Sequence, residues 1–83
     1  MTWNHRVVHR LIKRMPSERE GEHWYAVHEV YYDESGKPEM TTVEAVAPGG
    51  ETLDELRQEL DRFQKALEHP VLEYDSFTDE QKS

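Results

Sequence analysis

Three histidines are the side chains whose type and spacing could best carry chemistry in this chain of 83 residues. His5 and His9 fall on the same side of an expected strand, and His28 could lie on a neighbouring strand, so three imidazoles could hold a zinc ion. Residues four apart on a strand, however, are separated by about 13 Å at Cα, which is too far for both side chains to reach one ion comfortably. We therefore expect no metal and no cofactor, and we interpret these histidines as half-buried or surface side chains.

Acid–base chemistry has one candidate pair, His28 and Glu29. Adjacent residues on a strand point to opposite faces, so this pair would not share a pocket. Glu29 is better placed as an edge charge or as a cross-strand partner of Arg6 or Arg10. The sequence contains no glycine-rich phosphate loop, no nucleophile elbow and no cysteine. We expect no enzyme activity and no catalytic residue.

Two stretches that alternate with period two predict the strands that would position these side chains. The first runs from Trp3 to Ile12 and the second from His23 to Tyr32. Residues 13–22 lie between them, are polar and show no periodicity, so they predict a mobile connection rather than an element.

A hairpin turn is predicted from Asp33 to Lys37. Gly36 can take the positive φ that such a turn requires, and the Asp33 side chain can bond the turn's backbone. The chain is then expected to return as a third strand from Met40 to Val46, which a Pro-Gly-Gly run ends.

The following region predicts an amphipathic helix from Leu53 to about Glu68, before Pro70. Thr52 and Glu55 have the spacing of a capping box, in which a hydroxyl and a carboxylate each satisfy one free backbone N–H at the start of the helix. Apolar residues recur at steps of three and four and form one stripe, which we interpret as core: Leu53, Leu56, Leu60, Phe63 and Leu67.

These elements predict an α+β fold in the order β-β-β-α, a three-stranded antiparallel sheet followed by one amphipathic helix across a face. Residues 1–75 would form a single domain, and residues 76–83 an acidic tail that frays because it has too little apolar surface to order itself. A domain of this size buries only about 60% of its unfolded surface and has no cysteine to staple it. We therefore expect it to pack against another copy, as a homodimer, or against another protein.

One helix can cover only one face of the sheet, so the opposite face needs a partner. The second strand places Trp24 and Tyr32 on one side and Tyr25 and Tyr31 on the other, so either assignment leaves aromatic side chains for contact. Tyrosine and tryptophan dominate interface hot spots. Together with two acids from the polar face of the helix, the predicted partner-binding residues are Trp24, Tyr25, Tyr31, Tyr32, Asp54 and Asp61.

The charge of the chain excludes some partners. Its net charge of −8 repels a phosphate backbone, so we expect no direct binding to nucleic acid. The acidity is uneven, because residues 1–19 carry five basic residues and one acid and the rest of the chain carries the remaining acidic excess. There is no apolar leader, no run of about 20 apolar residues and no cysteine. A cytoplasmic protein away from the membrane is the expectation.

The strand order, together with Gly50-Glu51-Thr52-Leu53-Asp54-Glu55-Leu56 leading into the helix and Ala66-Leu67 near its end, resembles the N-terminal domain of HicB-like antitoxins. In that family a similar Thr-led turn opens the single long helix. The chain also looks like a set of short bacterial proteins built around His28-Glu29-Val30-Tyr31-Tyr32-Asp33, Gly36-Lys37-Pro38 and Val46-Ala47-Pro48, a resemblance that brings no activity with it.

The leading hypothesis is therefore a non-enzymatic module, antitoxin-like or regulatory, that binds a protein partner through an aromatic sheet face and an acidic helix surface. An alternative is an acidic inhibitor of the phage type, whose carboxylates occupy the basic groove of a nucleic-acid-binding protein. A third is a small metal-dependent enzyme, which would need stoichiometric zinc held through His9 or His28.

Overall fold

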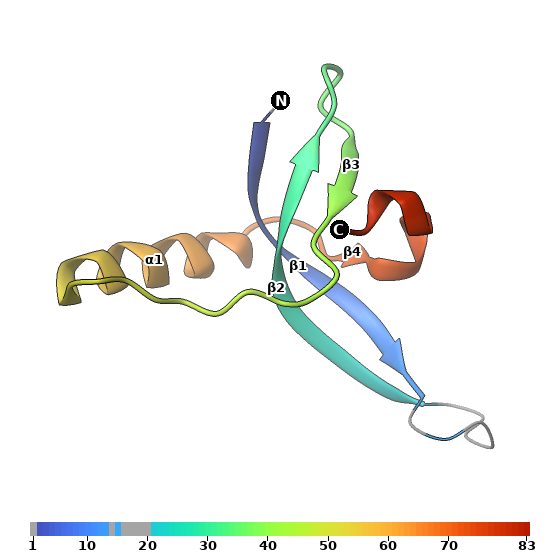
Figure 1. Ribbon diagram of the computed structural model, residues 1–83, viewed down its shortest axis with the longest axis horizontal. Helices are drawn as coiled ribbons and strands as arrows, with labels where there is room; N and C mark the ends of the chain where they lie inside the picture. The colour runs from blue at the N-terminus through green and yellow to red at the C-terminus, as the bar shows by residue number, and fades with distance from the viewer. Residues whose placement is uncertain (1, 14, 16–20) are drawn as a thin grey trace.

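The computed structural model describes residues 2–13, 15 and 21–83 and has an α+β fold with a mixed four-stranded sheet and one helix (Figure 1). Most of the predicted 13–22 connection lies outside the described residues. The elements are β1 (Thr2–Ile12), β2 (Glu22–Tyr32), β3 (Pro38–Thr41), α1 (Leu53–Ala66), β4 (Leu72–Glu73) and two short 3-10 helices, η1 (Tyr74–Ser76) and η2 (Asp79–Gln81). Over the described part of the chain, no helix has the length and apolar character needed to cross a membrane.

The strands β1 and β2 form a long antiparallel hairpin, as their alternation predicts. Their register runs from Thr2 opposite Tyr32 to Ile12 opposite Glu22, so even-numbered residues of both strands share one face and odd-numbered residues share the other. We call the face with Val8 the covered face, and the opposite face the helix face.

The turn after β2 has the predicted chemistry. Gly36 has φ 84°, in the region that favours glycine. One carboxylate oxygen of Asp33 accepts from the backbone N–H of Ser35 at 2.9 Å and of Lys37 at 3.0 Å. The Ser35 hydroxyl donates to the same oxygen, and these bonds lower the pKa of the Asp33 carboxyl.

The three predicted antiparallel strands are present, but the structure differs from the prediction in two respects. The third strand is short: β3 pairs with β2 only from Pro38 to Thr41, and beyond it the backbone keeps single bonds to β2, such as Val46 N to Val27 O at 2.9 Å. A fourth strand, β4, pairs in parallel with β1 at Val8 and His9 and gives the order β3-β2-β1-β4. Two residues are too few to show period-two alternation, which is why the sequence pattern misses this strand.

The C-terminal residues are not a frayed tail in the structure. Phe77 is buried, and the side chain of Gln81 caps η2 by accepting from the backbone N–H of Thr78 at 2.9 Å. Ser83 N donates to Thr41 O at 3.0 Å, and Val43 N donates to Ser83 O at 2.8 Å. The segment from β4 to the C-terminus thus covers one face of the sheet and supplies half of the buried core, which consists of Val8, Val30, Tyr74 and Phe77 with Tyr32 and Leu72 packed against it.

The helix α1 begins where the capping pattern predicts and ends slightly earlier, at Ala66. Thr52 Oγ1 accepts from Glu55 N at 3.1 Å, while the Glu55 carboxylate accepts from Glu51 N at 2.8 Å, one residue before the expected position. The helix does not lie across the sheet. It projects to one side of it (Figure 1), and only Ala66 is fully buried, so the apolar stripe predicted as core is largely uncovered.

Candidate functional site

The four aromatic residues predicted for partner contact do not form one surface. Trp24 and Tyr32 lie on the covered face, and Tyr25 and Tyr31 lie on the helix face. Tyr31 is half-buried against Trp3, with ring centroids 6.3 Å apart. Two of the four therefore remain as candidates at the surface, Trp24 and Tyr25.

The Tyr32 hydroxyl belongs to an internal polar network. It donates to Asn4 Oδ1 at 2.6 Å and accepts from the buried Arg6 guanidinium at 2.8 Å. A second nitrogen of that guanidinium donates to Pro70 O at 2.7 Å. The network ties β1 and β2 to the segment that leads into β4, which is a structural role.

Trp24 and Tyr25 lie on a two-stranded arm of the sheet. The strand β3 pairs with β2 only at Val30–Tyr32, and β4 pairs with β1 only at Val8 and His9. Among the described residues no third strand therefore flanks residues 10–12 of β1 and 22–25 of β2, which we call the arm. This arm extends to the lower right in Figure 1. Trp24 is 54% exposed on one side of it and Tyr25 is 61% exposed on the other. The Tyr25 ring contacts the His9 ring, with centroids 4.8 Å apart, and the rest of both aromatic side chains is exposed.

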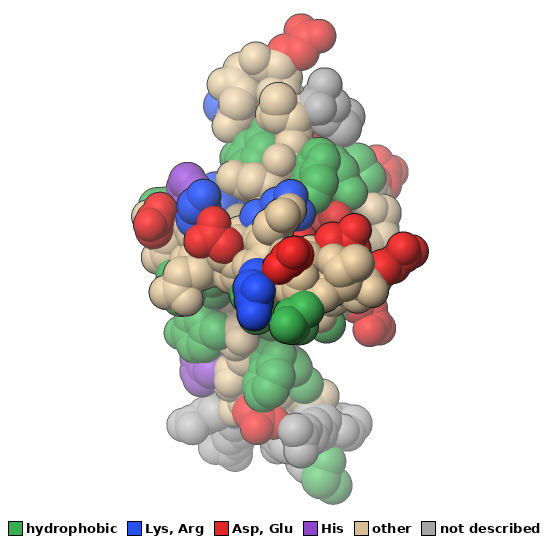
Figure 2. All heavy atoms as spheres, turned by 90° about the vertical axis from the view of Figure 1, so that its left-hand side faces the viewer, with side chains coloured by type: hydrophobic (Ala, Val, Ile, Leu, Met, Phe, Trp, Pro, Cys, Tyr) green, Lys and Arg blue, Asp and Glu red, His purple; other side chains and the backbone are tan. Residues whose placement is uncertain are grey.

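The two acids predicted for partner binding are ion-paired on the helix surface. Asp54 lies 3.1 Å from Arg57 Nη1, and Asp61 lies 3.2 Å from Lys65 Nζ. All four side chains are well exposed. These acids thus stand in a surface of mixed charge, as the end-on view in Figure 2 shows for this side of the molecule.

The helix carries a second surface that the sequence prediction placed in the core. Leu53, Leu60 and Leu67 are 63%, 49% and 66% exposed, respectively, and lie seven residues apart along one side of α1. We call these three residues the leucine stripe. Hydrophobic side chains lie uncovered beside charged ones on this side of the molecule (Figure 2). Amphipathicity alone signals such a stripe but does not say what covers it.

The side of α1 next to the stripe packs on β1. The Phe63 ring lies 4.8 Å from the His5 ring, centroid to centroid, and Trp3 meets His5 edge-on at 5.4 Å. Glu59 Oε1 lies 3.7 Å from His5 Nε2. His5 is therefore a buried contact between the helix and the sheet.

A pocket of about 480 Å³ lies where the start of β1 meets the end of α1. Trp3 and His5 line one side, and Arg62 and Lys65 line the other. Both cations are neutralised by acids of the same helix, Arg62 by Glu59 at 2.9 Å and Lys65 by Asp61. The pocket offers an aromatic wall without a free acid–base pair.

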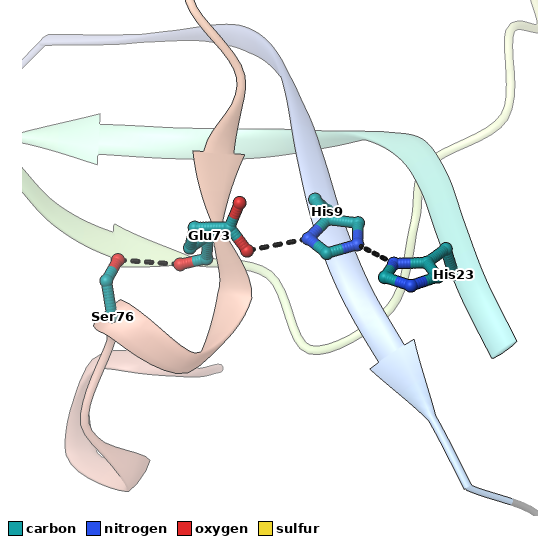
Figure 3. Close-up of polar contacts among 4 residues, drawn as sticks. All are labelled: His9, His23, Glu73 and Ser76. Carbon is teal, nitrogen blue, oxygen red and sulfur yellow. Dashed lines mark hydrogen bonds and ion pairs between the residues drawn. The ribbon is translucent and has the colours of Figure 1, made fainter. Parts of the chain in front are cut away.

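His9 lies at the centre of a polar chain that sequence reasoning missed (Figure 3). Its Nδ1 is 2.7 Å from Glu73 Oε2 and its Nε2 is 2.8 Å from Nδ1 of His23. The two ring planes are inclined by only 15°, and the ring centroids are 5.0 Å apart. Ser76, the nearest hydroxyl drawn, donates instead to the Glu73 carbonyl at 2.6 Å. This chain fastens β4 to β1 and to the start of β2 and contains no activated nucleophile.

His28 lies on the covered face, opposite His5 and His9. It is 1% exposed, and its Nδ1 lies 2.9 Å from Thr42 O, so Nδ1–H must be the donor because a carbonyl only accepts. Burial lowers the pKa of His28; the bond to Thr42 opposes this and the charge of Arg10 adds to it. Burial thus favours the neutral form of this imidazole.

The three candidate histidines are not brought together, and no group of three or more metal-ligating side chains exists among the described residues. Glu29 stands opposite His5 in the register rather than opposite an arginine. Arg10 is occupied elsewhere, with its guanidinium 4.0 Å above the Tyr74 ring and donating to Val43 O at 3.1 Å. The predicted pairing of Glu29 with Arg6 or Arg10 is therefore wrong.

Comparison with models of protein families, with curated proteins and with solved structures finds no match to this chain.

Proposed function

We propose that this protein is a non-enzymatic module, antitoxin-like or regulatory, that binds a protein partner in the cytoplasm. The observation that carries the proposal is the two-stranded arm, with Trp24 and Tyr25 exposed on its two sides. Large exposed aromatic side chains are costly in water and are typical anchors of protein interfaces. A partner that closes around the arm would bury both.

The fate of the other candidate residues favours binding over catalysis. His5 packs under α1, His9 fastens β4, and His28 is buried and neutral on the opposite face. Each of these imidazoles makes a contact that holds the fold together. In the described part of the chain, none belongs to a group of three or more side chains that could bind a metal ion. A zinc-dependent enzyme would need a different arrangement of them.

The kind of partner follows from charge and from the resemblance to HicB-like antitoxins. A net charge of −8 attracts a basic protein and steers its approach. Small basic toxins are the partners that the resemblance implies. The proposed partner is therefore a basic protein that the arm grips and that the acidic surface helps to attract.

The alternative is an acidic inhibitor of the phage type that occupies the basic groove of a nucleic-acid-binding protein. Its support is the same net charge. The helix argues against it, because Asp54, Glu59 and Asp61 each pair with a cation of the helix itself. Acidic side chains that already pair with neighbouring cations attract a basic groove less strongly than a surface of purely negative charge does.

The test is recovery of a partner from source cells with the tagged chain and three single variants. Trp24→Ser and Tyr25→Ser remove the arm aromatics, and Val71→Ser is the matched control because Val71 is also an exposed apolar residue but lies outside the arm. We expect a partner that binds the native chain and Val71→Ser, is lost with both arm variants, and stays bound when salt rises from about 0.05 to about 0.5 M, since apolar contacts are weakly screened. A partner that both arm variants retain, or that high salt releases, would overturn binding through the arm, and the second result favours the acidic inhibitor.

A further inference from the structure

The leucine stripe has a symmetry of its own. Leu60 lies midway between Leu53 and Leu67, with seven residues on either side, and all three are about half exposed or more. We propose that the stripe is an interface between two copies of this chain, whose α1 helices pack side by side in antiparallel orientation. This inference leaves the arm free and does not depend on the proposed function.

A second helix is the occupant that the spacing fits. Side chains repeated every seven residues stay on one side of a helix and interdigitate with the same repeat on another helix. The stripe spans 14 residue steps, about 21 Å at 1.5 Å per residue, and is therefore long enough for a helix pair. The half-buried Leu56 and Phe63 border it on the side of β1 and would complete the apolar seam.

The way α1 leaves the sheet favours the antiparallel arrangement. The helix starts at its free end, far from the strands, and returns toward them at its C-terminal end (Figure 1). In an antiparallel pair the two sheets lie at opposite ends of the helix pair and do not collide. The two-fold axis then passes at Leu60, which meets itself, while Leu53 meets Leu67 of the second copy.

The polar border of the stripe is complementary to itself in this orientation. Arg57, Gln64 and Glu68 lie along the side of the stripe away from β1, and all are exposed. Antiparallel packing brings Arg57 beside the second copy's Gln64 and within reach of its Glu68, and the two-fold axis repeats both contacts.

The first experiment is sedimentation equilibrium of the full chain over a concentration series. Leu60→Arg places two like charges against each other at the two-fold axis, whereas Gln58→Arg makes the same charge change about 200° around the helix and is the matched control. We expect the native chain and Gln58→Arg to move from one to two chain masses as concentration rises. Leu60→Arg should raise the dissociation constant at least about thirtyfold, the effect of losing a central anchor, with an unchanged circular dichroism spectrum. A native chain that stays monomeric, or a Leu60→Arg chain that still dimerises, overturns the proposal.

The absence of cysteine allows the orientation to be tested directly. Leu60→Cys alone should form a disulfide-linked dimer on mild oxidation, because residue 60 faces itself across the axis. Leu53→Cys alone should not, since its two copies lie about 21 Å apart, but it should cross-link when mixed with Leu67→Cys. A Leu53→Cys chain that cross-links to itself as fast as Leu60→Cys indicates parallel helices and overturns the antiparallel arrangement. These readouts do not involve Trp24 or Tyr25, so they succeed or fail separately from the partner test.

Discussion

The helix α1 and the segment of residues 72–83 reverse the roles that their sequences suggest. The helix has a capping residue, a regular apolar stripe and balanced charges, yet it fully buries only Ala66. The C-terminal segment is acidic, short of apolar residues and almost without regular structure, yet Tyr74 and Phe77 fill one face of the sheet. A regular sequence pattern therefore predicts that a helix or strand forms. Whether its side chains are buried depends on which other parts of the fold it contacts.

The difference has a physical cause in how each segment is attached. Residues 72–83 are fixed at three places: β4 on β1, the His9–Glu73 contact, and the backbone bonds between Ser83 and the end of β3. Such anchors offset the entropy of ordering an irregular segment. The side chains that fix the helix lie in its middle and its C-terminal half: Glu59 and Phe63 contact His5, and Ala66 is buried. Its free half relies on its own caps and ion pairs.

The largest expected effect comes from truncating the core of the C-terminal segment. Phe77→Ala removes a buried ring and should lower the free energy of unfolding by about 3–5 kcal/mol, a large part of the stability of a domain this size. Urea unfolding followed by tryptophan fluorescence measures this. Phe77→Leu keeps most of the volume and should cost less, which guards against a variant that does not fold.

Leu60→Ala is the counterpart on the helix. Measured at low concentration, where the chain is monomeric, it should change the free energy of unfolding by no more than about 0.5 kcal/mol because the side chain is exposed. Equal losses for Phe77→Ala and Leu60→Ala would mean that the Leu60 side of the helix is buried against the sheet in solution, so that helix and C-terminal segment would not differ in burial.

The pH dependence of stability should follow His28, on the side that the C-terminal segment covers. Burial lowers the pKa of His28 in the folded chain below its ordinary value of about 6.5, so the unfolded chain takes up the proton first. The contribution of neutral His28 to the free energy of unfolding is therefore fully present above pH about 6.5. It is lost as the pH falls below that value toward the lowered pKa.

Urea unfolding at pH about 7.5 and about 5.5 tests this expectation. The loss between the two pH values should shrink in His28→Gln, which keeps an N–H donor for Thr42 O, and should persist in His69→Gln, where the histidine is exposed. An undiminished loss in His28→Gln would mean that another group controls it.

How far the sequence predicts this fold depends on whether a feature is local. The β1–β2 hairpin, the Asp33 turn and the Thr52 cap are set by neighbours in the chain, and their patterns predict them. The strand β4 and the burial of Phe77 depend on contacts with β1 and β3 about 40 to 65 residues away. No local periodicity carries that information.

The same distinction applies to the candidate site. Alternation places Trp24 and Tyr25 on opposite sides of a strand, and their exposure follows from how far β3 and β4 extend, which the sequence does not specify. The alternation places Tyr32 at the surface because it does not reveal the contact with Arg6, 26 residues away. Glu73 reaches His9 only because β4 runs parallel to β1, so that pair carried no sequence signal.

An effect between those of Phe77→Ala and Leu60→Ala is expected at the helix cap. Thr52→Ala removes the acceptor for Glu55 N and should cost about 1 kcal/mol, mainly as fraying of the free half of α1. Circular dichroism at 222 nm should therefore fall before the fluorescence of the sheet changes. Thr52→Ser keeps the hydroxyl and should behave like the native chain. Simultaneous loss of both signals would show that the helix and the sheet unfold as one unit.

An effect on stability as small as that of Leu60→Ala is expected at Asp61, whose ion pair with Lys65 is exposed at both ends. Asp61→Asn should change the free energy of unfolding by no more than about 0.5 kcal/mol, since exposed pairs four residues apart contribute little. The variant is more informative in the partner test, because it removes one of the two acids predicted for binding and leaves the arm intact. If the arm anchors the partner, Asp61→Asn should slow association at low salt and leave dissociation unchanged, because a charge at the rim of an interface acts mainly on approach. Faster dissociation of Asp61→Asn than of Trp24→Ser would place the binding energy on the helix surface rather than on the arm.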